Sequence, residues 1–185
     1  MDAIEAIRSR RMLPRVGSEV PPREQIEELL ELAVRAPNHN RTEPWRFRVL
    51  AGAARERLAH AIADELVDST GADPDEAFAE GKKKVERAPV IVVFSCVSSD
   101  APGVVEQEEI ASVAMALENF LLAAHAKGLG AMLRTGAAAY HPAARKHLEL
   151  EPGEKVVGCV YLGYPQADRS LTERQSASTK TTWLG

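Results

Sequence analysis

The sequence has 185 residues, of which 45% are hydrophobic and 27% charged, and this composition is ordinary for one folded globular domain. Its formal net charge of -4 gives no field that would attract nucleic acid or an anionic membrane, so neither is expected as a partner. The amino terminus carries charge from its second residue and lacks an apolar stretch before a small-residue cleavage site, which predicts a cytoplasmic protein without an export signal.

The first part of the chain predicts two helices and a strand. Residues 2–10 have the apolar spacing of a short helix that ends in a basic run. A second helix begins after Pro22, and Pro37 ends it. Apolar and basic residues alternate over 45–50, which predicts a half-buried strand.

The middle of the chain predicts a peripheral, charged cover. A helix starts at about Ala53 and repeats leucine or isoleucine every four residues. Turn-forming residues predict a loop over 68–75, and a further charged helix is expected to end near Arg87. Any lid over a site is expected within 68–108.

The second half predicts most of the sheet. A β-branched run over 90–94 is apolar on both faces, as in a central strand, and two more strands are predicted at 131–135 and 156–163, separated by a helix that begins at Pro142. The sheet should therefore have at least four strands. The stretch 110–127 is apolar almost all the way round, so we expect a helix buried on every side, which favours a dimer core. It is too short for a confident membrane span.

The carboxyl-terminal stretch is polar yet ends in Trp183 and Leu184, which is unusual for a free tail. We therefore expect residues 168–185 to form an arm that docks on a partner subunit. No repeat or linker divides the chain, so residues 1–185 are expected to form a single domain. Cys96 and Cys159 both lie in apolar runs, which favours reduced, buried thiols.

Most familiar catalytic and binding motifs are absent from the sequence. It has no phosphate-binding Walker loop, no nucleophile-elbow serine and no zinc-spaced cysteine pattern, so no metal site is expected. Gly128 and Gly130 follow a helix and precede a strand, the reverse of a Rossmann turn. His60 with Asp64 is more simply a solvated pair, and His125 a core histidine with its hydrogen bonds satisfied.

Arg10, Arg11, Arg35 and Arg134 each lie at or near the boundary of a predicted element. A guanidinium group in such a place can hold an external anion through two hydrogen bonds, so four of them could build a phosphate site. The alternative is that these arginines are solvated or interact with helix carboxyl ends. Composition alone favours the alternative.

Five motifs in order change that balance. They are Arg10-Arg11, Arg35-Ala36-Pro37-Asn38-His39, Pro44-Trp45-Arg46-Phe47, Gly128-Leu129-Gly130 through Arg134-Thr135-Gly136, and Leu162-Gly163-Tyr164-Pro165. Together they resemble the nitroreductase family, particularly its short, minimal members. The resemblance runs from residue 2 to about residue 167, nearly the whole chain.

The resemblance implies an α+β fold with a mainly antiparallel central sheet flanked by helices, in an intertwined homodimer that holds FMN at the interface between its subunits. It also implies a set of cofactor-binding residues: Arg10, Arg11, Met12, Arg35, His39, Leu133, Arg134 and Thr135. Arg10 and Arg11 would hold the FMN phosphate and ribityl chain. Arg35 and His39 would contribute partly from the other subunit.

The residues after the second glycine motif would lie along the flavin. Arg134 would reach the phosphate, and a backbone N–H near Thr135 or Gly136 would face flavin N5. Two positions depart from the family pattern: Met12 stands where serine is usual, and Leu133 stands where short members often have tryptophan. Lys180 is basic and close to the C-terminus, but no role is assigned to it.

The function that the resemblance implies is an FMN-dependent NAD(P)H oxidoreductase. NADH or NADPH would give hydride to flavin N5, and an electron-poor small molecule of the nitroaromatic, quinone or enone class would then take it, with no catalytic side-chain base. Three alternatives stay open. They are a related flavin reaction such as dehalogenation, ring oxidation or flavin destruction, a non-catalytic flavin-binding or regulatory protein, and a dimeric scaffold whose arginines only cap helices.

Overall fold

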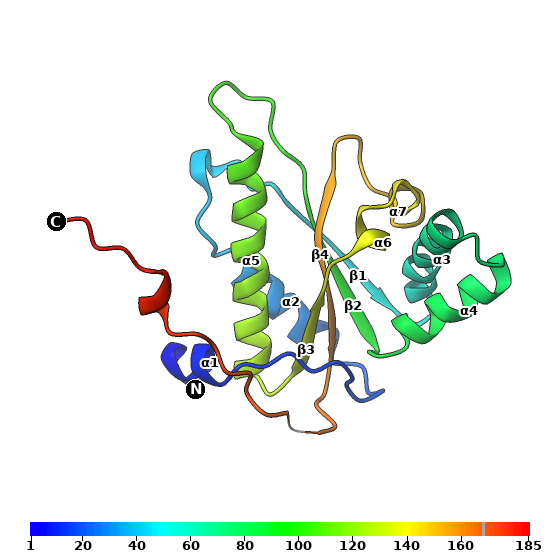
Figure 1. Ribbon diagram of the computed structural model, residues 1–185, viewed down its shortest axis with the longest axis horizontal. Coiled ribbons are helices and arrows are strands. Elements are labelled where there is room, and N and C mark those ends of the chain that lie inside the picture. Colours follow the sequence, from blue (N-terminus) through cyan, green and yellow to red (C-terminus); the bar gives the residue numbers. More distant parts are fainter. Residues whose placement is uncertain (168) are drawn as a thin grey trace.

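The computed structural model describes residues 1–167 and 169–185 of the chain. In these residues, helices cover both faces of one antiparallel sheet with strand order β1-β2-β4-β3 (Figure 1). The strands are β1 (Trp45–Ala51), β2 (Val90–Cys96), β3 (Gly130–Arg134) and β4 (Lys155–Gly163). The helices are α1 (Ala3–Ser9), α2 (Arg23–Ala33), α3 (Glu56–Thr70), α4 (Pro74–Val85), α5 (Glu106–Ala126), α6 (Ala137–Tyr140) and α7 (Pro142–His147), with 3-10 turns η1 (His39–Arg41), η2 (Gly52–Arg55) and η3 (Ala177–Lys180). The predicted α+β fold is confirmed.

β2 lies inside the sheet and is buried along its whole length, as its β-branched sequence predicts. It pairs antiparallel with β1 on one side and with β4 on the other. β3 pairs with β4 alone among the described strands, so β3 is an edge strand with one side available for other contacts. Cys96 and Cys159 are buried free thiols, and burial raises the pKa of Cys96 to about 11 and that of Cys159 to about 12.

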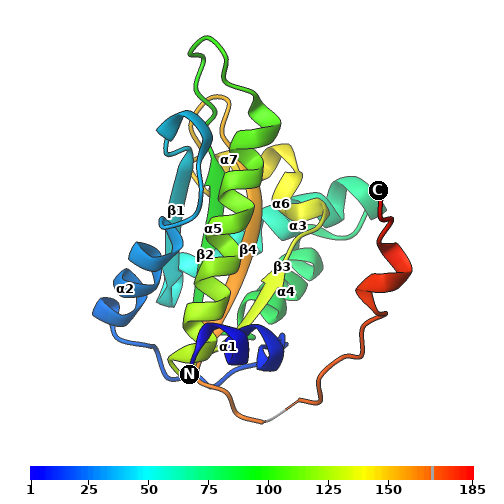
Figure 2. The same cartoon turned by 90° about the vertical axis from the view of Figure 1, so that its left-hand side faces the viewer.

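α2 and α5 cover one face of the sheet (Figure 2). An aromatic series fixes this contact, because the ring of Phe94 packs edge-on against Phe47 at 5.1 Å and against Phe120 at 5.3 Å between centroids. Burying one such side chain stabilises the fold by roughly 1.5–3 kcal/mol. The packing positions α5 along the full length of the sheet.

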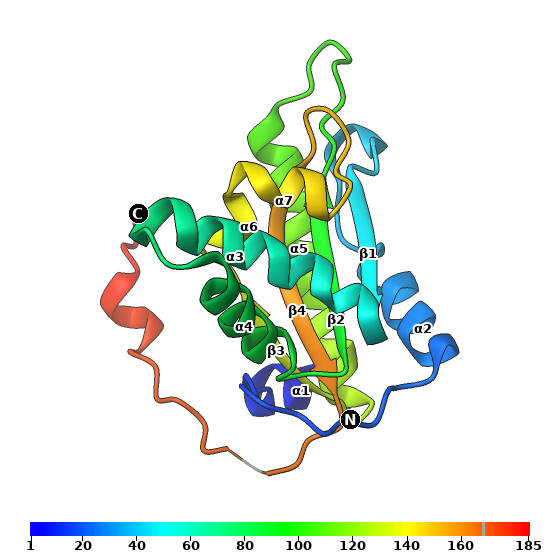
Figure 3. The ribbon, with the colours of Figure 1, turned by 90° about the vertical axis from the view of Figure 1, so that its right-hand side faces the viewer.

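α3, α4 and α7 cover the opposite face (Figure 3). Leu58 and Ile62 of α3 and Val85 of α4 belong to this second core. Gly81 allows α4 to approach α3 closely, because a Cβ at this position would lie 2.5 Å from the carbonyl oxygen of Ala59. The charged helix predicted to end near Arg87 was expected to be a peripheral cover, but α4 contributes Val85 to the second core.

The predicted loop over 68–75 is shorter than expected. α3 continues to Thr70 and ends at Gly71, whose φ of 71° lies in the left-handed region. α4 begins at Pro74, and the Asp73 side chain accepts hydrogen bonds from the N–H groups of Asp75 and Glu76. Only residues 71–73 connect the two helices.

α5 differs from its prediction at both its start and its surface. It begins at Glu106, where acidic residues in the first turn suit the positive end of the helix dipole. One stripe of its surface is uncovered in the single chain: Ala111 and Ala114 are exposed and Met115 is 40% exposed. The expected burial on every side, which favoured a dimer core, would therefore require a second chain. Among the described residues, no helix is both long and apolar enough to cross a membrane.

The carboxyl-terminal arm passes close to α1 and then runs away from the sheet (Figures 1 and 2). Near its start, Arg169 donates a hydrogen bond to the carbonyl oxygen of Met12 at 3.0 Å. At its end, Trp183 and Leu184 are 91% and 94% exposed. The predicted arm began at residue 168, which lies outside the described residues.

Candidate functional site

The segment that follows α1 runs along the outer side of the edge strand β3. The Leu13 N–H donates to the carbonyl oxygen of Ala131 at 2.9 Å, and the N–H of Leu133 points at the Met12 sulfur at 3.4 Å. These contacts fix residues 10–13 beside the strand. Arg10 comes directly after the helix, where its backbone N–H still bonds to Ala6.

Five arginines gather where this segment meets the carboxyl-terminal arm. A cavity of about 310 Å³ is lined by Ile7, Arg8, Arg10, Arg11, Met12, Arg169, Ser170, Leu171, Thr172 and Arg174. Among the residues that the structure describes, no acidic side chain lines it. Guanidinium groups concentrated in this way suit a phosphate, which accepts paired, charge-assisted hydrogen bonds.

The fold orients the Arg10 side chain but does not use all of its hydrogen-bond donors. One terminal nitrogen lies 3.0 Å from a carboxylate oxygen of Glu118 on α5. Its Nε is buried and has no hydrogen-bond acceptor among the described residues. A buried donor without an acceptor is costly, so the Nε is consistent with a ligand completing the site.

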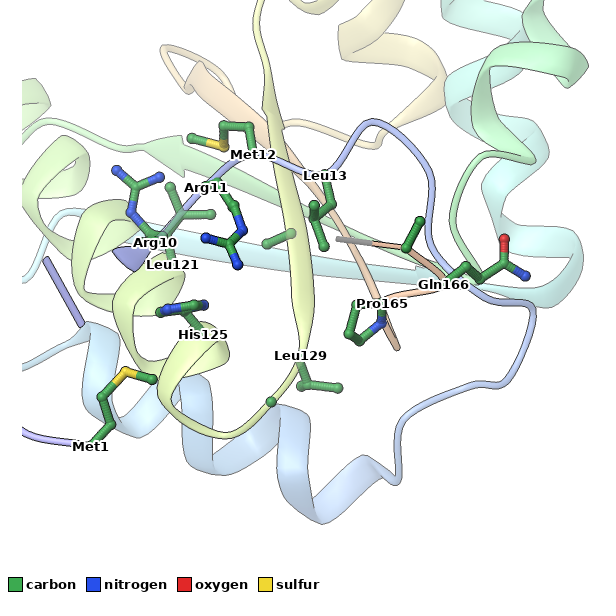
Figure 4. Close-up of a pocket in the computed structure, with 13 residues that line it drawn as sticks. Met1, Arg10, Arg11, Met12, Leu13, Leu121, His125, Leu129, Pro165 and Gln166 are labelled. Atoms are coloured by element: carbon green, nitrogen blue, oxygen red, sulfur yellow. The ribbon is translucent and has the colours of Figure 1, made fainter. Parts of the chain in front are cut away.

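A second cavity, of about 510 Å³, shares Arg10, Arg11 and Met12 with the first. Figure 4 shows Arg10, Arg11 and His125 gathered on one side of it. His125 shares a 2.8 Å hydrogen bond with the Ser9 hydroxyl. Burial, followed by the charges of Arg11 and Arg10, lowers the pKa of His125 below its ordinary value of 6.5, so the ring is neutral at pH 7. The expected hydrogen bond of His125 is present, although the ring lines a cavity.

Arg134 lies away from this arginine cluster in the single chain. Leu133 packs with Met12 on the α5 side of the sheet, whereas the Arg134 guanidinium lies over the Tyr161 ring on the α3 side, 5.3 Å from its centroid. Successive side chains of a strand point to opposite faces, which explains the separation. The Nε of Arg134 is also buried without an acceptor among the described residues.

Arg134 lines a third cavity, of about 260 Å³, at the end of β3. Thr135 and Gly136 line it too, together with Glu65 and two basic residues of the α4 region, Lys84 and Arg87. The N–H of Leu133 points outward from β3, and Thr135 follows directly after the strand ends at Arg134. Two residues span about 7 Å of strand, so the arginine cluster and Thr135 lie along one edge.

Arg35 and His39 are brought to neither arginine cavity within one chain. Both are exposed, Arg35 just after α2 and His39 at the start of η1. η1 lies beside the amino-terminal end of α5, the helix that carries the uncovered stripe (Figure 1). Arg35 and His39 could therefore contact an arginine-lined cavity only if that cavity belonged to another subunit.

The described residues contain no group of three or more histidine, cysteine or acidic side chains that could hold a metal ion. The expected pairing of His60 with Asp64 was wrong. Asp64 instead lies 2.8 Å from the ring nitrogen of His147 on α7, and His60 stacks on Phe78 at 4.3 Å. The contact between α3 and α7 therefore decides the partner of Asp64, and the i,i+4 spacing on α3 does not.

Comparison with known proteins assigns the chain to a family. The family model described as "Nitroreductase family" matches residues 7–164. The chain belongs to the nitroreductase family. A curated relative in Escherichia coli (strain K12), named "Putative NAD(P)H nitroreductase YdjA", is 32% identical over 172 residues, which cover 93% of each protein.

Solved structures agree with this assignment. A nitroreductase-like family protein from Bacillus cereus has a TM-score of 0.86 at 23% identity and covers 100% of this chain and 96% of its own. A Desulfovibrio desulfuricans protein described as a "putative nitroreductase", solved in complex with FMN, has a TM-score of 0.72 at 25% identity over 95% of this chain and 93% of its own. The nitroreductase fold is thus shown; the Escherichia coli relative is named for NAD(P)H, and the Desulfovibrio desulfuricans protein was solved with FMN.

The structure adds residues that sequence reasoning missed. Arg169 and Arg174 approach the first arginine pair, although only Lys180 had been considered near the C-terminus. Lys180 lines none of the cavities described above. The signal was present in the two arginines that flank Ser-Leu-Thr-Glu in the arm. Lys84 has no comparable signal in the sequence, because a charged helix surface does not indicate which cavity it borders.

Proposed function

We propose that this nitroreductase-family member is an FMN-dependent NAD(P)H oxidoreductase that reduces an electron-poor small molecule of the nitroaromatic, quinone or enone class. The observation that carries the proposal is the arginine-lined cavity at one end of an edge strand whose other end presents Thr135 and Gly136. The relatives support it, because one is named for NAD(P)H and another was solved with FMN.

The arginine cluster fits the phosphate of FMN. Arg10, Arg11, Arg169 and Arg174 would hold it, and the unsatisfied Nε of Arg10 would gain an acceptor. The two departures from the family pattern contact each other, since the Met12 sulfur meets the N–H of Leu133. Met12 and Leu133 would therefore give the ribityl chain an apolar wall.

The far end of the strand fits the flavin ring. An outward N–H at Thr135 or Gly136 would donate to N5, and Lys84, Arg87 and Arg134 would place positive charge beside the ring. When bound, FMN supplies hydride transfer between NADH or NADPH and the acceptor through N5. The chain itself binds and orients, so no side-chain acid or base is assigned.

We also propose a homodimer in which Arg35 and His39 reach the cofactor of the second subunit. The uncovered apolar stripe of α5 lies beside η1, so a second copy that covers the stripe would meet both residues. The carboxyl-terminal arm, with its exposed Trp183 and Leu184, would dock on the same partner.

Reconstitution tests the proposal. Purified apoprotein is titrated with FMN, and the visible flavin absorption is followed after anaerobic addition of NADH or NADPH. We expect one FMN per chain and rapid bleaching by at least one nicotinamide. Binding without bleaching would favour the non-catalytic flavoprotein, and absence of binding would reject the cofactor assignment.

A further inference from the structure

Glu109, in the first turn of α5, is a buried acid that the proposed site does not use. It is 2% exposed and accepts hydrogen bonds from the Thr42 hydroxyl at 2.5 Å, the Asn38 amide at 3.3 Å and the Ser99 N–H at 3.5 Å. No described basic side chain pairs with it. A buried carboxyl group of this kind depends on its neutral donors, because a buried polar group without partners is strongly unfavourable.

Two of the donors, Asn38 and Thr42, belong to a loop with an unusual backbone. Asn40, Arg41 and Glu43 have φ values of 62°, 54° and 50°, a region that side chains other than glycine rarely adopt. Such conformations persist only where the surroundings hold them. The Asn38 side chain holds the loop from within by accepting the Glu43 N–H at 2.8 Å. Glu109 fastens the same loop to α5 through Asn38 and Thr42.

The loop carries the residues that lie outside their own subunit's arginine cavities. His39 and Arg41 are exposed on it, and the exposed Arg35 comes just before it. The uncovered stripe of α5 begins at Ala111, two residues after Glu109. The conformation of residues 38–43 therefore determines where His39 and Arg41 project beside the proposed interface.

We infer that Glu109 is a positioning residue for the cofactor site of the partner subunit. It would hold residues 38–43 in the shape that carries His39 across the interface, close to Arg35 in sequence, without itself touching FMN. The inference rests on the proposed function and extends it, because it assigns a role to a residue far from its own chain's arginine cluster.

Substitutions on the two sides of one hydrogen bond test this role. Glu109→Gln keeps the side-chain shape but presents an amide to the donors, and Thr42→Val removes the shortest donor without altering α5. We expect each to weaken FMN binding about tenfold in a fluorescence titration, with the dimer intact in size-exclusion chromatography. Glu108→Gln, one residue earlier and exposed, is the matched control and should bind like wild type. Wild-type affinity in both test variants would overturn the inference.

Mixed dimers distinguish action across the interface from general support of the fold. Arg10→Ala and Glu109→Gln chains carrying different tags are co-expressed, and the mixed dimer is isolated. If Glu109 serves the partner's site, one site receives both substitutions and the other receives neither, so one site per dimer binds FMN with wild-type affinity.

If Glu109 serves its own chain, each site carries one substitution. The tightest site in the mixed dimer is then about tenfold weaker than wild type, and the inference fails. A wild-type dimer without FMN affinity would overturn the proposed function as well, so the two failures are distinguishable.

Discussion

Arg48 and Arg10 are both partly buried arginines, yet their surroundings give them different roles. Arg48 forms an ion pair with the fully buried side chain of Glu154 and donates to the carbonyl oxygen of Glu149 at 2.8 Å. Its donors are used within the fold. Arg10 makes one ion pair with Glu118 and keeps a buried Nε without an acceptor in the described structure. Glu154 and Glu118, the acidic partners of Arg48 and Arg10, come from distant parts of the chain. Residue type and spacing in the sequence therefore could not distinguish the structural arginine from the candidate ligand-binding one.

Glu154 makes stability depend on pH. Burial by itself would raise the pKa of Glu154, but hydrogen bonds from Arg48, Ser95 and the Glu151 N–H, with the charge of Arg48, lower it below 4.5. A lowered pKa in the folded state stabilises the fold above the pKa of the unfolded chain, and this contribution is lost as the pH falls through the folded value.

We therefore expect Glu154→Gln to lower the free energy of unfolding by about 3 kcal/mol at pH 7. The difference from wild type should shrink when urea unfolding is repeated at successively lower pH below 4.5. Glu151→Gln, whose exposed side chain lies outside this network, is the control. A cost that is the same at both pH values would contradict the role of the charge.

At the scale of elements, local sequence patterns predicted those helices and strands that local interactions determine. Alternation over 45–50 marked β1, whereas α2 ends at Ala33, before the boundary that was predicted at Pro37. The same alternation puts Leu133 and Arg134 on opposite faces of β3, a consequence that the sequence interpretation did not draw when it set both along the cofactor. α6, with four residues, was too short to leave a periodic signal. The approach of the arm to α1 depends on contacts between the two ends of the chain, which no window of sequence contains.

The arm should contribute to cofactor affinity through its first half only. Truncation after Ala167 removes Arg169 and Arg174, and we expect FMN binding to weaken at least tenfold, because a hydrogen bond to a charged group contributes about 1.5–3 kcal/mol. Truncation after Lys180 removes Trp183 and Leu184 but keeps both arginines, so FMN affinity should stay close to wild type. Equal affinities for the two truncated proteins would exclude the arm from phosphate binding.

At the scale of the whole molecule, α5 belongs to the core by one side and remains uncovered on the other. Phe120 and Leu121 are buried against the sheet, while Met115 is 40% exposed. A single chain thus completes its sheet and its arginine cluster but leaves Arg35 and His39 outside. The sequence already predicted a dimer from the apolar character of this helix, although it could not say which side a second chain would cover.

Met115→Glu should separate the proposed dimer into monomers, because it places a charge on the stripe that a second copy would cover. The expected result in light scattering is half the wild-type mass, together with loss of FMN from a chain that remains folded by circular dichroism. Ala79→Glu, exposed on α4 across the sheet, should leave the mass unchanged. A Met115→Glu protein of wild-type mass would show that the subunits meet elsewhere.

The edge strand β3 also bears on solubility. Residues 12 and 13 contact its outer side at Ala131 and Leu133, and any uncovered part of such an edge can pair with another extended chain, which is how strand edges seed aggregation. A ligand lying along that edge would shield it. The cofactor-free protein should then aggregate more readily than the protein with its cofactor bound.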